Sequence, residues 1–474
     1  MKVCMILEGS YPYVRGGVSS WMHQYIQAMP QIEFVLWCIG ADSKDKDKFK
    51  YELPDNVVSV EQVFLNDALK VESKCTKKLV LDPYQKRELK KLLTCENFNW
   101  DVLFKILVYD EFEIQDLLLC EDFFNLMKEV CMEGNLEVSF SEYFYTIRSM
   151  LLPVLYVIKG NVPEADIYHS TATGYSGIIG SLATWKNNKP YILTEHGIYT
   201  REREEELLQA TWVLPEMRQY WIKLFYLFSN CAYEKAAAVT ALFPKANITQ
   251  QELGCSPEKT RVIANGVHYE RFKNIPLKKS DGWIDIGAVI RIAKIKDVKT
   301  LIYSFMECKN YMQGSRKKIR LHIMGDVDDK EYFEECKLII EQNYIEDVIF
   351  TGVVNVIEYM EKIDFTILTS ISEGQPLSVL ESFAARRPCV TTDVGCCREL
   401  LEGVGDDNLG MAGICVPPMH KEKLALAMKE LCEDDNKRLK MGETGQKRVE
   451  KYYTHEISMK QYADMYEEVL KNWR

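Results

Sequence analysis

Several common sequence signals are missing from this chain. Its fifteen cysteines include no Cys-x-x-Cys pair, which argues against a zinc site or a disulfide framework and favours a reduced cytosolic compartment. No run of about eighteen uncharged apolar residues occurs, so we expect no membrane-spanning helix. The apolar stretch at the amino terminus reaches Glu8 too soon for a signal-peptide core. We therefore expect a cytoplasmic protein.

Positive charge is also in short supply. The chain has 59 Lys and Arg against 70 Asp and Glu, for a formal charge of −11. This balance argues against a nucleic-acid partner or direct binding to an anionic membrane, so any phosphate contact must be local. A hydrophobic content of 47% over 474 residues is typical of a globular protein with two domains.

The first apolar stretch leads into a glycine-containing turn. Residues 2–7 predict a buried strand, and a helix is expected from about Ser19. Between them, Gly16 and Gly17 lack the third glycine of a dinucleotide fingerprint, which disfavours NAD binding. Two adjacent glycines still let backbone N–H groups approach a phosphate or sugar closely. The alternative is a turn without a ligand.

Alternating strands and helices predict the domain organisation. The pattern indicates two doubly wound α/β domains of parallel strands that face a cleft. We expect the first over residues 1–272, with a helical insertion at 41–163 that is longer than an ordinary connection. A shift to Lys, Pro and Ser opens the second domain, at 273–455, and an amphipathic helix follows at 456–474.

The most informative stretch, residues 364–395, predicts a strand, a loop, a helix and a second strand. Glu373 lies in the loop, and Glu381 follows after seven residues, about two turns into the helix. If the intervening residues were fully helical, the two carboxylates would lie roughly 12 Å apart along the axis. That separation is too large for one shared proton or metal ion, so the two carboxylates would hold the two ends of an elongated ligand. The alternative is a chance pair in an acidic helix.

The residues between the two glutamates add to this interpretation. Gly374 permits unusual backbone angles, and Pro376 fixes the start of the helix. The free N–H groups of Leu377 and Ser378 would seat a phosphate at the helix amino terminus. Gln375, beside Gly374, lies at the Glu373 end of the motif and is a candidate for selecting the part of the ligand that binds there.

Three further candidates follow predicted strands. His196 stands at the carboxyl end of the strand at 191–194, where ligands of open α/β sheets bind. Arg291 follows the strand at 284–290, and Lys296 or Lys294 supplies a second positive charge in the same loop. Arg201 and Arg203 could bind phosphate or simply pair with neighbouring glutamates, so their role stays open.

The run Glu-Gly-Gln-Pro-Leu-Ser begins at Glu373, and Glu381 follows after seven intervening residues. This pair of glutamates and the residues between them resemble the donor-binding signature of retaining family-4 glycosyltransferases of the GT-B fold. The string Thr-Glu-His-Gly-Ile-Tyr around His196 resembles one branch, the cytosolic glycosyltransferase of Pel-type exopolysaccharide assembly. The resemblance implies that Glu381 holds ribose, Glu373 the sugar hydroxyls, and Arg291 with Lys296 the diphosphate. It also implies a nucleobase seat at Gly352 and Val353, a position for His196 near the transferred sugar, and a final helix that crosses back to the first domain.

The resulting hypothesis is transfer of a hexose or N-acetylhexosamine from a UDP-sugar to a glycan hydroxyl, with retention, in exopolysaccharide biosynthesis. Membrane subunits of a polysaccharide synthase are further partners that this hypothesis allows, and they would recruit the protein to the membrane. We assign no Asp-x-Asp metal site to a strand end, and expect transfer without a metal ion or other cofactor. The alternatives are a nucleotide-sugar epimerase of the same fold and a non-catalytic scaffold subunit of a synthase. The sugar, the acceptor and the oligomeric state are not predicted.

Overall fold

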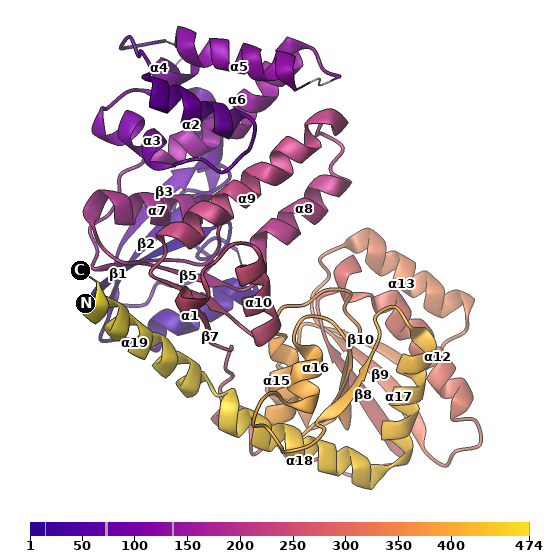
Figure 1. Cartoon of the computed structure of the whole chain (residues 1–474). Coiled ribbons are helices and arrows are strands. Elements are labelled where there is room, and N and C mark those ends of the chain that lie inside the picture. The colour runs from indigo at the N-terminus through magenta and orange to yellow at the C-terminus, as the bar shows by residue number, and fades with distance from the viewer. Residues whose placement is uncertain (15, 72–73, 135–136, 474) are drawn as a thin grey trace. The chain divides into compact units, whose positions relative to one another are not determined.

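The computed structural model describes residues 1–14, 16–71, 74–134 and 137–473. The chain divides into two compact units (Figure 1). The first comprises Met1–Val262 and Tyr462–Arg474, and the second Ile263–Gln461. The boundary thus falls ahead of the one expected after residue 272. The fold class is confirmed, because each unit contains one fully parallel, doubly wound sheet.

The first unit is organised around a seven-stranded sheet in the order β3-β2-β1-β4-β5-β6-β7. The strand order reverses beside β1, which creates a switch point between β1 and β4. Residues 3–7 of β1 are at most 1% exposed, because helices cover both faces of the sheet. The strands are β1 (Lys2–Glu8), β2 (Glu33–Gly40), β3 (Val57–Phe64), β4 (Ile167–Ser170), β5 (Tyr191–Glu195), β6 (Ala238–Ala241) and β7 (Thr260–Val262).

The predicted helical insertion is wrong in its first part. Residues 57–64, within the expected range 41–163, form strand β3, which pairs in parallel with β2. β3 lies at the edge of the sheet, so only its last residue is fully buried and its sequence has no continuous apolar run. The helical part of the insertion begins later, at α2.

The helices of the insertion share the core of the first sheet. One continuous hydrophobic cluster joins Trp37 of β2 to Phe104 of α3 and Leu155 of α6, and Figure 1 shows these helices gathered at one side of the unit. The insertion therefore does not have a separate hydrophobic core. The helices of the unit are α1 (Gly17–Gln27), α2 (Pro83–Leu93), α3 (Asp101–Phe104), α4 (Ile114–Leu118), α5 (Glu121–Glu133), α6 (Phe140–Ile158), α7 (Tyr175–Asn187), α8 (Tyr199–Gln209), α9 (Arg218–Lys235) and α10 (Pro244–Glu252).

The second unit repeats the design with six strands in the order β10-β9-β8-β11-β12-β13. Its switch point lies between β8 and β11. The strands are β8 (Trp283–Val289), β9 (Lys318–Met324), β10 (Val348–Gly352), β11 (Phe365–Leu368), β12 (Cys389–Thr392) and β13 (Gly413–Val416). The helices are α11 (Tyr269–Phe272), α12 (Val298–Tyr311), α13 (Lys330–Gln342), α14 (Val356–Met360), α15 (Leu377–Ala384), α16 (Cys397–Glu402), α17 (Lys421–Glu433) and α18 (Asp435–Tyr452).

The last helix, α19 (His455–Asn472), begins in the second unit and continues in the first. Tyr466 fixes its second half. This side chain is fully buried, and its hydroxyl lies 2.7 Å from the Tyr25 hydroxyl and 2.6 Å from Nδ1 of His169 on β4. The end of the chain is thus part of the core of the first unit.

No helix in the part of the chain that the structure describes is long and apolar enough to cross a membrane. All fifteen cysteines lie in that part and carry free thiols, most of them buried.

Candidate functional site

The loop of residues 369–376, here called the donor-site loop, connects β11 to α15 at the switch point of the second sheet. Its Glu373 carboxylate contacts residues from two loops. Lys296 Nζ donates to Glu373 Oε1 at 2.6 Å, and the Ser370 hydroxyl donates to the same oxygen at 2.5 Å. The Lys296 and Glu373 side chains are 17% and 11% exposed. The structure therefore brings two of the predicted site residues into direct contact.

Backbone contacts hold the donor-site loop in place. The Thr369 hydroxyl donates to the carbonyl of Lys296, and the Ile371 N–H donates to the carbonyl of Ile295. On the other side, Gly395 has a φ of +54°, and a Cβ there would lie 2.2 Å from the Glu373 carbonyl oxygen. Only glycine fits this approach. The loop shape is thus determined before any ligand binds.

Arg291 and the two candidate lysines follow β8 at the same sheet edge. The Arg291 guanidinium is 62% exposed and pairs with Asp328. Lys294 is 71% exposed, with its Nζ 3.7 Å from an oxygen of Asp329. Of the two lysines only Lys296 reaches Glu373, so its assignment as the diphosphate lysine is the better supported prediction.

An Asp-x-Asp pair does follow a strand, contrary to the expectation from the sequence. Asp326 and Asp328 come after β9, at the carboxyl edge of the second sheet. Asp326 accepts a hydrogen bond from the Val327 N–H, and Asp328 pairs with Arg291. Within the described residues, no three His, Cys, Asp or Glu side chains are grouped so that they could hold a metal ion. Transfer without a metal stays a prediction.

α15 begins at Leu377, with Ser378 in its first turn and Pro376 at the preceding cap position. The backbone N–H groups of this turn face the carboxyl edge of the sheet, as expected for a phosphate seat. Glu381 lies one turn further on. Burial raises the pKa of the Glu381 carboxyl to about 7, and the positive charge of Arg271 opposes that rise. A donor that offers hydroxyl groups would satisfy this poorly solvated carboxylate.

The predicted nucleobase seat lies at the end of β10. Gly352 has a φ of +67°, a conformation that favours glycine, and Val353 is 75% exposed. The Gly352 carbonyl accepts a hydrogen bond from the Gly325 N–H at 3.0 Å, and a nucleobase site at this exposed turn stays a prediction.

In the first unit, His196 follows β5 and packs against Trp21 of α1, with ring centroids 4.3 Å apart. Burial lowers the pKa of His196 to about 4, so the imidazole is neutral at physiological pH, and its Nε2 has no hydrogen-bond partner within the described structure. Gly16 and Gly17 start the same helix that carries Trp21. Gly16 is extended, with φ at 176° and open space around both glycines, so folding alone does not require glycine there.

Glu195 precedes His196 and is nearly inaccessible to water. The Tyr233 hydroxyl and the Gln250 amide donate to its Oε2 at 2.7 and 2.9 Å. Burial nevertheless raises the pKa of Glu195 to about 7. These contacts anchor the turn that presents His196.

Arg201 and Arg203 lie on α8. Arg203 donates to Glu206 at 2.6 Å, and Arg201 lies 4.0 Å from Glu252. The structure thus favours carboxylate pairing over a phosphate contact for Arg203.

Sequence reasoning missed several residues of the two sites. Trp21 and Gly395 act through contacts between segments that are distant in sequence, and a single sequence carries no signal for those contacts. Ser370 is only three residues from Glu373, and its hydrogen bond to that carboxylate depends on the conformation of the loop. Asp326 and Asp328 could have been found, because in the sequence they directly follow a short, mostly apolar stretch and Gly325. Of the candidate residues in the second unit, Lys296 and Glu373 are in direct contact, whereas Arg291 pairs with Asp328 and Glu381 is influenced by Arg271.

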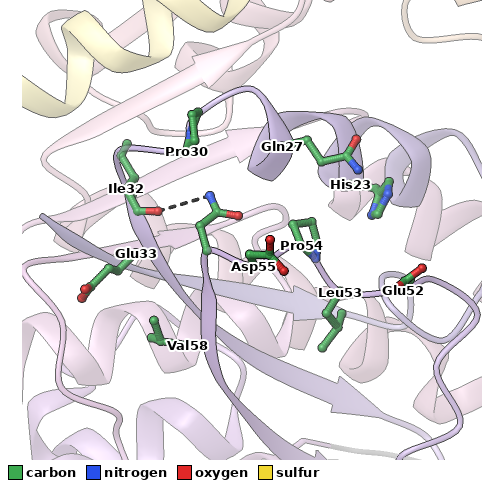
Figure 2. Close-up of a pocket in the computed structure, with 11 residues that line it drawn as sticks. His23, Gln27, Pro30, Ile32, Glu33, Glu52, Leu53, Pro54, Asp55 and Val58 are labelled. Atoms are coloured by element: carbon green, nitrogen blue, oxygen red, sulfur yellow. Dashed lines mark hydrogen bonds between the residues drawn. The ribbon is translucent and has the colours of Figure 1, made fainter.

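A separate cavity of about 710 Å³ lies in the first unit (Figure 2). His23 and Gln27 of α1, Glu33 at the start of β2, and residues 52–55 before β3 line it. It therefore lies toward the amino ends of these strands, where the ligands of doubly wound sheets do not usually bind. It contains none of the predicted site residues.

Two family models match the chain. The model described as "Domain of unknown function (DUF3492)" matches residues 1–258. The model described as "Glycosyl transferases group 1" matches residues 270–448.

Curated relatives are similar over most of the chain. A capsular polysaccharide biosynthesis glycosyltransferase, CapM of Staphylococcus aureus, is 23% identical over 341 residues, which cover 69% of this chain and 82% of that protein. The MMP alpha-(1->4)-mannosyltransferase of Mycolicibacterium hassiacum is 21% identical over 318 residues, covering 66% of this chain and 73% of that protein.

Solved structures share the fold over nearly the whole chain. Anabaena Alr3699/HepE in complex with UDP has a TM-score of 0.62 at 16% identity, covering 99% of this chain and 100% of that one. Sucrose-phosphate synthase from Thermosynechococcus elongatus has a TM-score of 0.59 at 15% identity, with the same coverage. The two parallel-sheet, Rossmann-like units thus match the fold of these GT-B glycosyltransferase structures.

Proposed function

The chain belongs to the DUF3492 family and carries a group 1 glycosyltransferase domain, and from this premise we propose that it transfers a sugar from a UDP-sugar to a glycan hydroxyl with retention of anomeric configuration. One observation supports this most strongly. Glu373, Lys296 and the first turn of α15 meet at the switch point of the second sheet, where an anionic ligand with hydroxyl groups has partners for both kinds of group.

The donor would lie along the motif. Glu381 would hold the ribose hydroxyls and Glu373 those of the transferred sugar, with the diphosphate between them on the N–H groups of Leu377 and Ser378. UDP is the nucleotide in the Anabaena structure, and we extend it to this chain as part of the proposal.

Charge separation is the main cost of the reaction. The bond between the anomeric carbon and the diphosphate oxygen breaks, and negative charge develops on the departing phosphate. Lys296, Arg291 and the helix amides would stabilise that charge, the kind of electrostatic contribution that usually dominates catalysis. Arg291 would first have to leave Asp328.

Retention would follow from attack on the same face. The acceptor oxygen forms its bond to the anomeric carbon on the face that the phosphate leaves, and its proton passes to a phosphate oxygen, so charge and atoms balance. Glu373 is already engaged by Lys296 and Ser370, which makes it a poor nucleophile for a covalent intermediate. His196 would lie near the transferred sugar, as the family resemblance implies.

Isothermal calorimetry with UDP, GDP and ADP tests the donor site. We expect micromolar binding of UDP alone, lost in Arg291→Ala and Glu381→Ala. Absence of nucleotide binding by folded protein would contradict the proposal and support the scaffold alternative. Chelation with EDTA should leave UDP binding and transfer unchanged if no metal is needed.

Product analysis separates transfer from epimerisation. A transferase needs an acceptor to consume a UDP-sugar, whereas an epimerase converts it alone. NMR of the product's anomeric proton would show whether configuration is retained. Polysaccharide biosynthesis is the role of the CapM relative. A place in exopolysaccharide assembly of the Pel type, at the cytoplasmic face of the membrane with membrane subunits as partners, is the corresponding proposal here.

A further inference from the structure

A buried hydrogen bond joins the donor-site loop to residues 263–268, here called the linker segment, where the chain leaves the first unit. The Asn265 N–H donates to Gln375 Oε1 at 2.6 Å. Asn265 is 6% exposed and Gln375 7%, and 110 residues separate them in the sequence. The amide oxygen that was a candidate for reading the sugar therefore already has a backbone partner.

The linker segment is itself firmly held. The Val267 N–H donates to the Tyr453 carbonyl, and the His455 N–H donates to the Val267 carbonyl, both at 2.9 Å. A Cβ at Gly266 would lie 2.2 Å from the carbonyl oxygen of Thr454. Because the segment is fixed against residues 453–455, it is a rigid support for whatever it contacts.

The chain just after this segment reaches the other end of the same motif. α11 packs against α15, and the positive charge of Arg271 acts on the Glu381 carboxyl. Residues 263–272 thus meet the motif at Gln375 and again near Glu381. Contact at both ends of the motif indicates that residues 263–272 support the whole motif.

We propose that Gln375 is a positioning residue, whose amide oxygen ties the donor-site loop to the linker segment and so holds the loop in its ligand-binding shape. This inference rests on the proposed function. It assigns Gln375 no part in choosing the sugar, because its effect passes through the loop. Loss of this hydrogen bond should therefore lower the affinity for UDP and for every UDP-sugar by the same factor.

Gln375→Leu is the variant that tests this, because leucine removes the acceptor and keeps most of the volume. Calorimetry would compare UDP, UDP-glucose and UDP-N-acetylglucosamine. Leaving a buried N–H unsatisfied predicts a loss of affinity of about tenfold, in the same ratio for all three. The KM for the donor should rise while kcat is largely kept.

Gln446→Leu is the matched control. The Gln446 amide on α18 donates to the carbonyls of Lys273 and Ala384, at 3.1 and 2.9 Å. It also ties the start of the second unit to α15, yet does not touch the donor-site loop. We expect UDP affinity in this variant within about twofold of the wild type, since the loop keeps its own tether.

Hydrogen exchange gives a second readout that needs no activity. In the wild type, UDP should slow amide exchange in residues 263–268, and Gln375→Leu should speed it without ligand. The wild-type measurement stands even if the variant folds poorly.

The possible outcomes are distinct. If Gln375→Leu loses affinity for the UDP-sugars but not for UDP, Gln375 contacts the sugar and the positioning role is wrong. Unchanged affinity of this variant for all three ligands, or linker-segment amides that UDP does not protect in the wild type, would also overturn the positioning role. Wild-type protein that binds none of the three nucleotides would instead overturn the proposed function, and the inference with it.

Discussion

Replacing Lys296 by methionine separates the contribution of this residue to folding from its contribution to ligand binding. Methionine keeps the length of the side chain and removes its charge, so Glu373 loses the Nζ that lies 2.6 Å from its Oε1. Removing one partner of a fully buried ion pair costs about 3–5 kcal/mol. Because these side chains are 17% and 11% exposed and Ser370 still donates to Glu373, we expect a smaller destabilisation, of about 1–3 kcal/mol.

The double variant Lys296→Met/Glu373→Gln should recover most of that stability. A neutral amide no longer needs a cation, so the double variant should be within about 1 kcal/mol of the wild type. Its UDP affinity should stay low, because the diphosphate still lacks a positive partner. A charge-assisted hydrogen bond contributes about 1.5–3 kcal/mol, which corresponds to about 10- to 100-fold in affinity.

Thermal unfolding and calorimetry with UDP measure the two effects separately. A loss of 1 kcal/mol lowers Tm by about 2–4 °C in a unit of this size. Lys294→Met is the control, since its side chain is 71% exposed and 3.7 Å from Asp329; it should change neither quantity. A double variant as unstable as the single one would refute the pairing argument. Undiminished UDP affinity in Lys296→Met would refute its placement at the diphosphate.

Three further substitutions test other parts of the structure. Glu381→Gln should raise the free energy of unfolding at pH 8 by about 1–3 kcal/mol and leave it unchanged at pH 4. The reason is that the carboxyl has a pKa of about 7 in the folded state against its ordinary value of 4.5, so the stability of the wild type falls as the pH rises between these two values. Thermal unfolding of both proteins across this pH range measures the effect, and parallel curves would contradict it. Gly395→Ala should lower the free energy of unfolding by more than about 2 kcal/mol and weaken UDP binding, because the new Cβ would lie 2.2 Å from a backbone oxygen of the donor-site loop. Gly405→Ala is the control, because Gly405 also has a positive φ, of +58°, but has open space around it. This variant should lose about 1 kcal/mol of stability and keep its UDP binding. Tyr466→Phe should destabilise the protein by about 1–3 kcal/mol in denaturant unfolding, since two buried partners lose a hydrogen bond, and Tyr344→Phe, 90% exposed, should have no effect.

The sequence predicted buried strands well. β1, β5 and β8 lie within one residue of the predicted strands at 2–7, 191–194 and 284–290, because a parallel strand covered on both faces is a mostly apolar run that ends at glycine, proline or charge. β3 was missed for the opposite reason. Its residues are mostly half-buried or exposed, and Glu61 and Gln62 break the apolar pattern. The sequence of such an edge strand does not show that it pairs with a neighbour, so the strand is recognised only in the structure.

The sequence predicted which residues belong to the candidate site, but not which of them are in contact. Spacing and turn chemistry singled out Glu373 and Lys296, yet their ion pair joins positions 77 residues apart. It exists because β8 and β11 are neighbours at the switch point, which only the sheet order shows. Gln375 shows the same limit, because its partner Asn265 lies 110 residues away in the sequence.

The charges of the site also bear on how a nucleotide would leave. Lys296 and Arg291 each pair with a carboxylate, Glu373 and Asp328. A diphosphate that enters the proposed site must therefore exchange one anionic partner for another, so the net gain would be smaller than the attraction of two free cations would give. When the product UDP departs, the carboxylates can take the cations back, which lowers the cost of release. In a chain of net charge −11, such an exchange would let the proposed site bind a diphosphate without a strongly basic surface.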